Sequence, residues 1–386
     1  MPFTGKATYS AGNKLPEIAE DVSDIVSIVS PFETPLLDHL GDPARTAMST
    51  YHEWLEDALI PNMDTLADYY PPGDPVTATT LVVANGTRIR VGDQLRMQGS
   101  SEIMYVTSVS TNDVVVTRGY GGTTKVALVN MTPVHIIGNA ALEGDDAPQA
   151  RFTNRVRKGN WSQIFASSVR VSGSDLAVRK LAIGDELDYQ KQERLRELLR
   201  DLENTVICGR APAATPEGSS TVRRAMNGLL SMIKTNVFKP NAGGFSNETS
   251  LSEAHLNLAI RKIWENSNAR VDTIVVNGHQ KRQINKFIAA TARNFAGGDT
   301  TYRDLVSVYE SDYGVCRIIL SRAMPPDTVM LLDSSRVSVL PLAGRNFHYK
   351  PLATTGDYEA GEVIGEYTVE LRNELAHGVL TNLDAS

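Results

Sequence analysis

The sequence predicts an α+β fold with a small all-β domain inserted into it. Short runs of alternating apolar and polar residues, separated by turn residues, fill positions 76–140 and are typical of a barrel or sandwich. A helical rhythm of apolar residues follows over 175–207, and helix and strand patterns are mixed over 222–345. At 386 residues the chain is long enough for two or three units with separate cores.

Residues 1–50 are interpreted as an N-terminal arm without a core of its own. Prolines interrupt this stretch and restrict helix continuation; they are Pro16, Pro31, Pro35 and Pro43. One short helix is still predicted between Ile18 and Val29, where apolar residues recur at helical spacing. Its apolar stripe needs a covering surface, and another subunit is a candidate to supply it.

The segments 51–75 and 141–173 are predicted to be the two limbs of an extended loop, with the all-β domain of residues 76–140 at its tip. In the second limb, apolar residues alternate with polar ones, which indicates a strand. The apolar set is Trp161, Phe165, Val169 and Val171.

The length of this strand separates two hypotheses. A single extended run over residues 151–171 would span roughly 70 Å at about 3.3 Å per residue, whereas a globular chain of this size is roughly 55 Å across. Such a strand would overhang its own molecule. A break at Gly159 would instead give two ordinary strands, and both hypotheses stay open at this point.

A long amphipathic helix is predicted from Asp175 to Ile207, with a length of about 50 Å. Ser174 is the expected N-cap, and Asp175 would lie at the positive end of the helix dipole. Gly184 would start or bend the helix. Together with the loop that follows, this helix accounts for residues 174–221.

The region after this loop has a mixed α/β pattern. Ser250 and Glu253 are spaced as a capping box that opens a helix. The run DTIVVN predicts a buried strand, HQKRQINKFIAAT a helix, and VSVYESDYGVCRIIL a hairpin around 312–314. VMLLD and RVSVLPL predict two more strands, and the alternating residues of 346–386 predict a late strand that returns to an earlier core.

The sequence carries no recognisable motif of catalysis or metal binding. The chain has no P-loop and no GxSxG elbow, and GYGGTT at 119–124 is interpreted as a hairpin turn. His52 and Glu53 resemble the start of a zinc-protease motif, but the second histidine is replaced by Glu56. His279 and His377 are interpreted as cap or surface residues. We therefore expect no catalytic residue, no cofactor and no metal site.

An acidic cluster lies close in sequence to three arginines that would alternate onto one strand face. The residues are Glu143, Asp145, Asp146, Arg151, Arg155 and Arg157. They form either a solvated loop and strand edge or a set of intersubunit salt bridges, in which complementary charge determines register and choice of partner.

Composition excludes several classes of protein. The formal net charge of -7 gives none of the basic excess with which nucleic-acid binders neutralise phosphates. Cys208 and Cys316 are too few for a disulfide framework, which favours a reducing cytoplasm. Without a signal-like apolar segment at its start or a run of about 18 apolar residues, the chain is expected to be neither secreted nor embedded in a membrane.

Three segments, in this order, resemble the major capsid proteins of tailed bacteriophages with the Hong Kong ninety-seven type fold. They are ALEGDDAPQARFTNRVRKGNWSQIF, then KQERLRELLRDLEN, and finally LATTGDYEAGEVIGEYTVELRNELAHGVL. The resemblance covers most of the chain but not residues 76–140, and it rests on the order of structural segments rather than on a catalytic motif.

The resemblance implies a peripheral domain with a spine helix at 174–221, an axial domain at 222–345 and return strands at 346–386, besides the extended loop and the N-terminal arm. It also implies a major capsid protein that self-assembles into hexamers and pentamers, which form an icosahedral shell enclosing double-stranded DNA. The expected partners are other copies of the chain, with scaffold, portal and decoration proteins as further candidates and DNA as a neighbour by proximity. The expected location is the virion capsid, assembled in the host cytoplasm.

Three other hypotheses are considered. An encapsulin shares the fold but packages an enzyme in place of a genome, and shell size and cargo would distinguish it. A two-domain hydrolase with a β accessory module would need convergent polar residues in a pocket. Recognition of a host glycan by the inserted β domain is compatible with a shell function.

Overall fold

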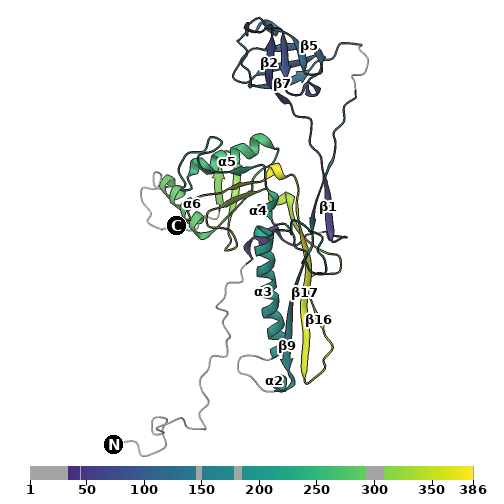
Figure 1. Cartoon of the computed structure of the whole chain (residues 1–386). Coiled ribbons are helices and arrows are strands. Elements are labelled where there is room, and N and C mark those ends of the chain that lie inside the picture. The colour runs from purple at the N-terminus through teal and green to yellow at the C-terminus, as the bar shows by residue number, and fades with distance from the viewer. Residues whose placement is uncertain (1–33, 44, 145–149, 178–184, 293–307, 386) are drawn as a thin grey trace, which may run out of the picture. The chain divides into compact units, whose positions relative to one another are not determined.

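The computed structural model describes residues 34–43, 45–144, 150–177, 185–292 and 308–385. The helix predicted between residues 18 and 29 lies outside them. The chain divides into two compact units: residues 55–156 form one, and residues 1–54 with 157–386 form the other. Figure 1 shows the elements of both units, each of which is described by itself.

The centre of the larger unit's first sheet is β17 (Tyr358–Leu371), which alternates as predicted. One edge of β17 pairs antiparallel with β9 (Gln163–Ser172) over the whole length of β9. The opposite edge pairs first with β16 (His348–Pro351) and then with β15 (Val337–Pro341). This late strand therefore returns to an earlier segment of the chain.

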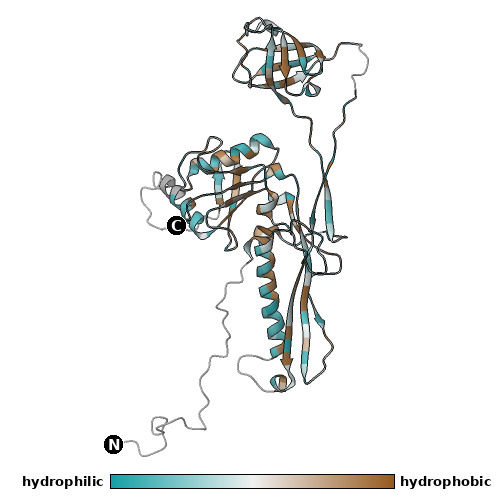
Figure 2. Ribbon diagram, viewed as in Figure 1, coloured by the Kyte–Doolittle hydropathy of each residue, from teal (hydrophilic) through white to brown (hydrophobic). Residues whose placement is uncertain are grey.

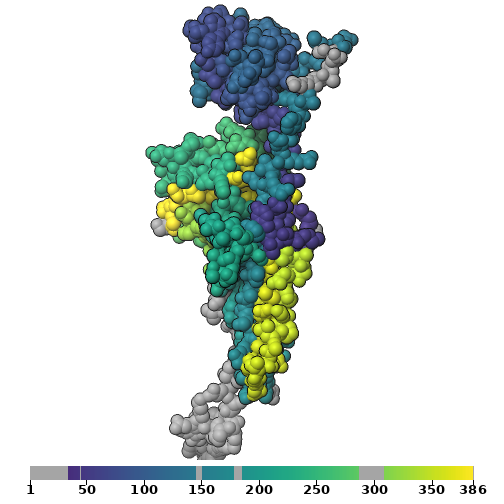
Figure 3. Space-filling model, turned by 45° about the vertical axis from the view of Figure 1, so that its right-hand side comes forward, coloured from purple at the N-terminus to yellow at the C-terminus, as the bar shows by residue number. Residues whose placement is uncertain are grey.

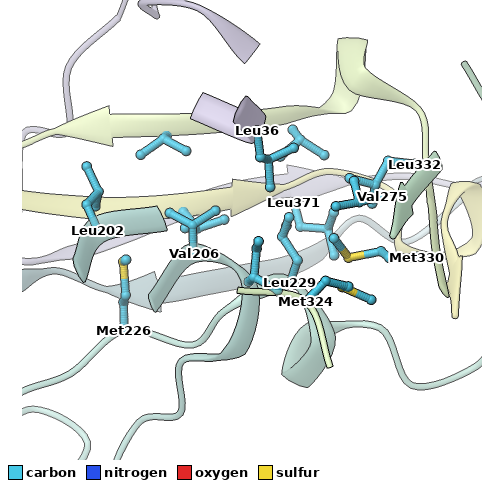
Figure 4. Close-up of a cluster of buried hydrophobic side chains, with 14 of the residues drawn as sticks. Leu36, Leu202, Val206, Met226, Leu229, Val275, Met324, Met330, Leu332 and Leu371 are labelled. Atoms are coloured by element: carbon cyan, nitrogen blue, oxygen red, sulfur yellow. The ribbon is translucent and has the colours of Figure 1, made fainter. Parts of the chain in front are cut away.

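The helix α3 (Glu186–Cys208) packs on this sheet. Its inward residues are buried among apolar side chains of β9, β15 and β17; they are Leu198, Leu202, Val206 and Ile207. Figure 4 shows Leu202 and Val206 in this core, together with Leu371 of β17. In Figure 2 the visible surface of α3 is mainly hydrophilic. The helix is therefore amphipathic, as the helical spacing of its apolar residues predicts.

The predicted start of this helix is wrong. Residues Gly173–Ala177 form a short separate helix, α2, in which the amide of Asp175 donates to Ser172 Oγ at 3.2 Å. The long helix begins at Glu186, because the side chain of Asp185 caps it by accepting from two amides of the first turn. Residues 178–184, including the predicted bend at Gly184, lie outside the described residues.

A six-stranded sheet forms the rest of the larger unit, in the order β10-β18-β14-β11-β13-β12. The strands are β10 (Val237–Phe238), β18 (Gly378–Leu380), β14 (Val329–Leu332), β11 (Thr273–Val276), β13 (Gly314–Leu320) and β12 (Val308–Ser311). All residues of β11 are buried, and β12 and β13 form the hairpin that the sequence predicts. Helices α5 (Glu253–Asn266) and α6 (Gly278–Ala292) belong to this part of the fold. The short α4 (Leu229–Met232) instead packs against α3 and β17.

The cap of α5 differs from the prediction. The N-cap is Ser252, whose Oγ accepts from the amide of His255 at 3.3 Å. Ser250 lies two residues further out, so Glu253 is the first helical residue and cannot occupy the third position that a capping box requires.

The strand predicted over 151–171 is broken, but at Ser162 rather than at Gly159. The two parts are β8 (Val156–Trp161), which pairs with β1 (Tyr51–Glu56), and β9, which pairs with β17. Ser162 is buried between them. Its amide donates to the carbonyl of Thr50 at 2.8 Å and its hydroxyl to Glu366 at 2.6 Å.

The smaller unit contains a closed barrel in the order β2-β3-β6-β5-β4-β7. Its strands are β2 (Met63–Tyr70), β3 (Thr80–Val83), β4 (Asp93–Met97), β5 (Met104–Ser110), β6 (Asp113–Thr117) and β7 (Pro133–Asn139). The first strand therefore begins before residue 76, where the alternating pattern was taken to start. Pro71 and Pro72 separate β2 from the rest of that pattern.

The glycine run at 119–124 is not a hairpin turn. It forms the 3-10 helix η3 (Tyr120–Gly122) in the connection from β6 to β7, and these two strands do not pair with each other. Gly119, Gly121 and Gly122 all have positive φ angles, which glycine adopts without strain.

A buried ion pair ties together the loops at one end of the barrel. Arg118 donates to both carboxylate oxygens of Glu102, each at 2.7 Å, and both side chains are almost fully buried. The same guanidinium donates to the carbonyls of Ala78 and Val126, and Glu102 accepts from the amide of Val126. Full use of donors and acceptors is the condition under which a buried ion pair is tolerated.

Candidate assembly surfaces

One face of β17 carries a row of glutamates. Glu362, Glu366 and Glu370 are four residues apart, and alternation along a strand places them on the same face. Glu366 is buried and accepts from Arg224 at 2.5 Å. Arg345 Nε lies 2.8 Å from the other carboxylate oxygen, although its N–H is not aimed at that oxygen. The face is therefore acidic, with Arg224 and Arg345 beside Glu366 and Lys350 of β16 beside Glu362.

Glu370 connects the root of the β1–β8 ribbon to this face. Its carboxylate lies 2.8 Å from His52 Nε2 in β1 and 3.2 Å from both Arg45 and Arg372. The hydrogen bond from His52, together with the charge of Arg45, lowers the pKa of Glu370 despite its burial. Residues 45–52 are thereby held on β17 by the ion pair of Arg45 and the hydrogen bond of His52.

A second attachment holds α1 (Pro35–Leu40) at the junction of α3 and the six-stranded sheet. Glu203 of α3 accepts from the amides of Leu36 and Leu37 at 3.2 and 3.3 Å, and from Ser321 Oγ at 2.7 Å. Burial raises the pKa of Glu203, against these hydrogen bonds. Figure 4 shows Leu36 pointing into the apolar core beside Leu371.

The chain on either side of the barrel exposes large apolar side chains. Leu59 is 91% exposed and Phe152 82%, and both belong to the smaller unit near its ends. Leu55, Leu142 and Val156 are exposed as well. These exposed apolar side chains are candidates for contact with another protein.

The structure describes four of the six predicted contact residues. Glu143 is exposed, and Asp145 and Asp146 lie outside the described residues. Within the described part of the chain, no ion pair joins Glu143 to an arginine of the cluster. The intersubunit salt bridges considered for this cluster therefore stay a prediction.

The arginines of this cluster differ from one another. Arg151 donates to the carbonyl of Thr87 within the smaller unit, and Arg155 is exposed before β8 begins. Only Arg157 lies in the strand, 3.7 Å from Glu53 of β1, and both side chains are well exposed. The predicted common strand face of Arg155 and Arg157 is therefore wrong, because the strand starts at Val156.

The row of glutamates in β17 was missed in the sequence. The pattern is visible in GEVIGEYTVEL, where Glu recurs at every fourth position. This spacing places the glutamates on one face of a strand. Two cationic partners of this row, Arg45 and Arg224, carried no signal, because they are far from it in sequence.

The histidines also needed the structure. His377 is a cap residue, because it follows the 3-10 helix η5 (Glu374–Ala376) as its C-cap, but it is buried rather than at the surface. Its Nδ1 accepts from the amide of Asp333 and its Nε2 lies 3.3 Å from the carbonyl of Arg372. Burial lowers the pKa of His377 to about 4. His279 lies 3.2 Å from Gln283 on α6. In the ranges that the structure covers, no group of three or more His, Cys, Asp or Glu side chains could hold a metal ion.

No helix in the described residues is long and apolar enough to cross a membrane. The architecture instead combines a long helix on a four-stranded sheet, a six-stranded sheet with helices and a two-stranded ribbon, which is the α+β fold of Hong Kong ninety-seven type capsid subunits. The capsid of a native GTA particle shares this fold, at 10% sequence identity and a TM-score of 0.50, over 98% of this chain and 99% of that one. The likeness defines the class of fold, that of the Hong Kong ninety-seven type.

The family model described as SU10 major capsid protein matches residues 3–384, and the chain belongs to this family. A major capsid protein of Escherichia phage Phieco32 is 26% identical over 127 residues, a match that spans 33% of this chain and 34% of that relative. A structure from Microbacterium phage Oxtober96 is similar at 13% identity and a TM-score of 0.47, covering 93% of this chain and 95% of that one.

Family membership confirms the resemblance drawn from the sequence. The chain is a structural protein of the phage capsid rather than an enzyme, and its location is the virion capsid. The hydrolase hypothesis is therefore dropped.

Proposed function

We propose that copies of this chain assemble into hexamers and pentamers, which build an icosahedral shell around double-stranded DNA. The observation that carries the proposal is the match to a major capsid family over residues 3–384. The apolar side chains exposed beside the barrel support it, because they have no core of their own to enter.

The proposed layout assigns a peripheral domain to the spine helix and linker at 174–221 with the return strands at 346–386, and an axial domain to 222–345. Two strand pairings support a finer boundary between the peripheral and axial domains. β15 pairs with β17, which favours the peripheral domain for it, and β18 pairs with β14, which favours the axial domain.

In the same layout, residues 51–75 and 141–173 form the extended loop, residues 1–50 the N-terminal arm and residues 76–140 the inserted domain. Closure of the barrel between Met63 and Asn139 supports an insertion. The first strand of the barrel then belongs to the inserted domain rather than to the loop.

In this proposal, assembly rests on many modest contacts between copies. Each contact can be weak, because neighbours in a partly formed shell are present at high effective concentration. Leu59 and Phe152 would bury apolar surface against an adjacent copy. Glu143 and Arg155 would select partners by charge. Arg157 would do the same once its contact with Glu53 is broken. Arg151 is less suited to this role, because it already hydrogen-bonds within its own subunit.

The net charge of -7 suits a wall that lies near DNA without gripping it, because repulsion between exposed charges fades beyond about 8 Å at physiological salt. Scaffold, portal and decoration proteins remain predicted partners. A glycan-binding role of the barrel remains a compatible prediction.

Electron microscopy of particles purified from infected cells tests the proposal. We expect regular shells of pentameric and hexameric rings with DNA inside. A compact dimer under every assembly condition would contradict it. Shells that hold an enzyme in place of DNA would favour the encapsulin hypothesis.

A further inference from the structure

One edge of β9 has no partner in the described structure. β9 pairs with β17 on one side, and no strand pairs with it on the other. Just before β9, the amide of Ser162 donates to the carbonyl of Thr50 beside β1. The same edge of the strand therefore already accepts a partner at β8 and is empty along β9.

The hydrogen bonds around β9 identify the backbone groups that point outward. In an antiparallel pair, the N–H and C=O of one residue point to the same side, and successive residues alternate. The amide of Gly173 bonds Asp357 on the β17 side, so odd-numbered residues of β9 face β17. The N–H and C=O of Glu366 both hydrogen-bond to residues on the side of β17 that faces away from β9. Ile164 lies opposite Glu366 in the pairing of the two strands, so its own N–H and C=O point away from β17.

The outward N–H and C=O groups belong to Ile164, Ala166, Ser168 and Arg170. Within the described residues, no hydrogen bond satisfies them. The side chains of these residues are exposed too, Ile164 by 50%. The helix α3 covers the opposite face, where Phe165, Val169 and Val171 are buried, and thus does not occupy the edge.

This edge lacks the features that normally protect an edge strand. From Gln163 to Val169 it contains no proline, no lysine and no inward charge, and its pairing with β17 has no bulge. Figure 3 shows the strands of this sheet at the surface, with β16 and β17 in yellow beside the teal of the β9 and α3 region. An open edge of this length is a template for an added strand.

We propose that the outer edge of β9 pairs with a β-strand from a second copy of this chain. The inference rests on the proposed shell function, because a shell surrounds each subunit with copies of itself. A strand in this position would continue the hydrogen-bonded ladder that β1 begins on the same edge. The side chains of β9 up to Ser168 are uncharged, so the added strand would need no particular charge to pair with them.

Residue-resolved hydrogen exchange on dissociated subunits and on assembled shells tests the pairing. We expect the amides of Ile164, Ala166 and Ser168 to exchange at least about tenfold more slowly in shells than in subunits. The amides of Phe165 and Ser167, which face β17, are the internal control and should be protected in both states. Equal exchange of the outward amides in both states, whether fast or slow, overturns the proposal; slow exchange in both would show that the subunit covers its own edge.

The substitution Ala166→Pro provides a second test. It removes an outward N–H that the subunit itself does not use, and proline is tolerated on such an edge. We expect folded subunits whose yield of shells falls at least about tenfold, whereas Ala166→Thr, which keeps the N–H, assembles like the wild type. Wild-type yield from folded Ala166→Pro contradicts the proposal; if this variant does not fold, the exchange pattern decides. Failure of the wild type to form shells would contradict the proposed function instead.

Discussion

At the scale of single residues, burial decides what the titratable groups of this chain do. Glu370 and Glu203 are both buried carboxylates, yet the pKa of Glu370 is lowered and that of Glu203 is raised. The difference follows from their partners, since Glu370 faces Arg45 and His52 whereas Glu203 meets only neutral donors. Sequence context alone does not distinguish these two environments.

We predict that acid destabilises the subunit through His377. Its pKa is about 4 in the folded chain and about 6.5 when exposed, so the unfolded state binds the proton first as pH falls. The free energy of unfolding should therefore decrease between pH 6.5 and pH 4, by roughly 3 kcal/mol in total, and this contribution is fully present above pH 6.5. Urea titrations of dissociated subunits at pH 7, 5 and 4 measure it.

The matched control is His377→Gln, which removes the titrating group. The difference in unfolding free energy between wild type and variant should change across this pH range, while other groups cancel. A constant difference from pH 7 to pH 4 would contradict the assignment to His377.

At the scale of elements, the strongest local constraint is the ion pair that ties the loops of the barrel. We predict that Arg118→Met destabilises the barrel by about 3–5 kcal/mol, because it leaves the carboxylate of Glu102 buried without its cation. Thermal unfolding of the full chain, followed by calorimetry, should show one transition moved to lower temperature.

Two variants check this mechanism. Arg118→Met combined with Glu102→Leu should recover part of the loss, since no charge is then left unpaired. Arg96→Met, at an exposed position of β4, should leave the transition nearly unchanged. A double variant less stable than Arg118→Met alone would argue against an unpaired charge as the cause.

At the scale of the whole molecule, the two compact units have separate apolar cores. We predict that replacing residues 62–140 with a short glycine–serine linker leaves the larger unit folded. The deletion begins before residue 76 because β2 is a strand of the barrel. A deletion that began at the predicted start, residue 76, would leave β2 without the strands it pairs with. Circular dichroism and proteolysis of the deletion variant test this, and loss of α3 and of the six-stranded sheet would refute an inserted domain.

The sequence by itself determined the elements whose signal is local. The apolar period of α3, the alternation of β17 and the buried strand β11 follow from the chain's own geometry, in which side chains repeat every 3.6 or 2 residues. The resemblance and the family were accessible for the same reason, because they rest on ordered segments.

Only the tertiary structure decided which distant residues meet. The break at Ser162 depends on Glu366, and the attachment of β1 depends on contacts of His52 and Arg45 with Glu370, more than three hundred residues away. Local periodicity cannot encode such partners, because a hydrogen bond or ion pair between remote segments forms only after the fold has brought them together. The unpaired edge of β9 belongs to the same class, since a strand's neighbours are a property of the sheet rather than of the strand.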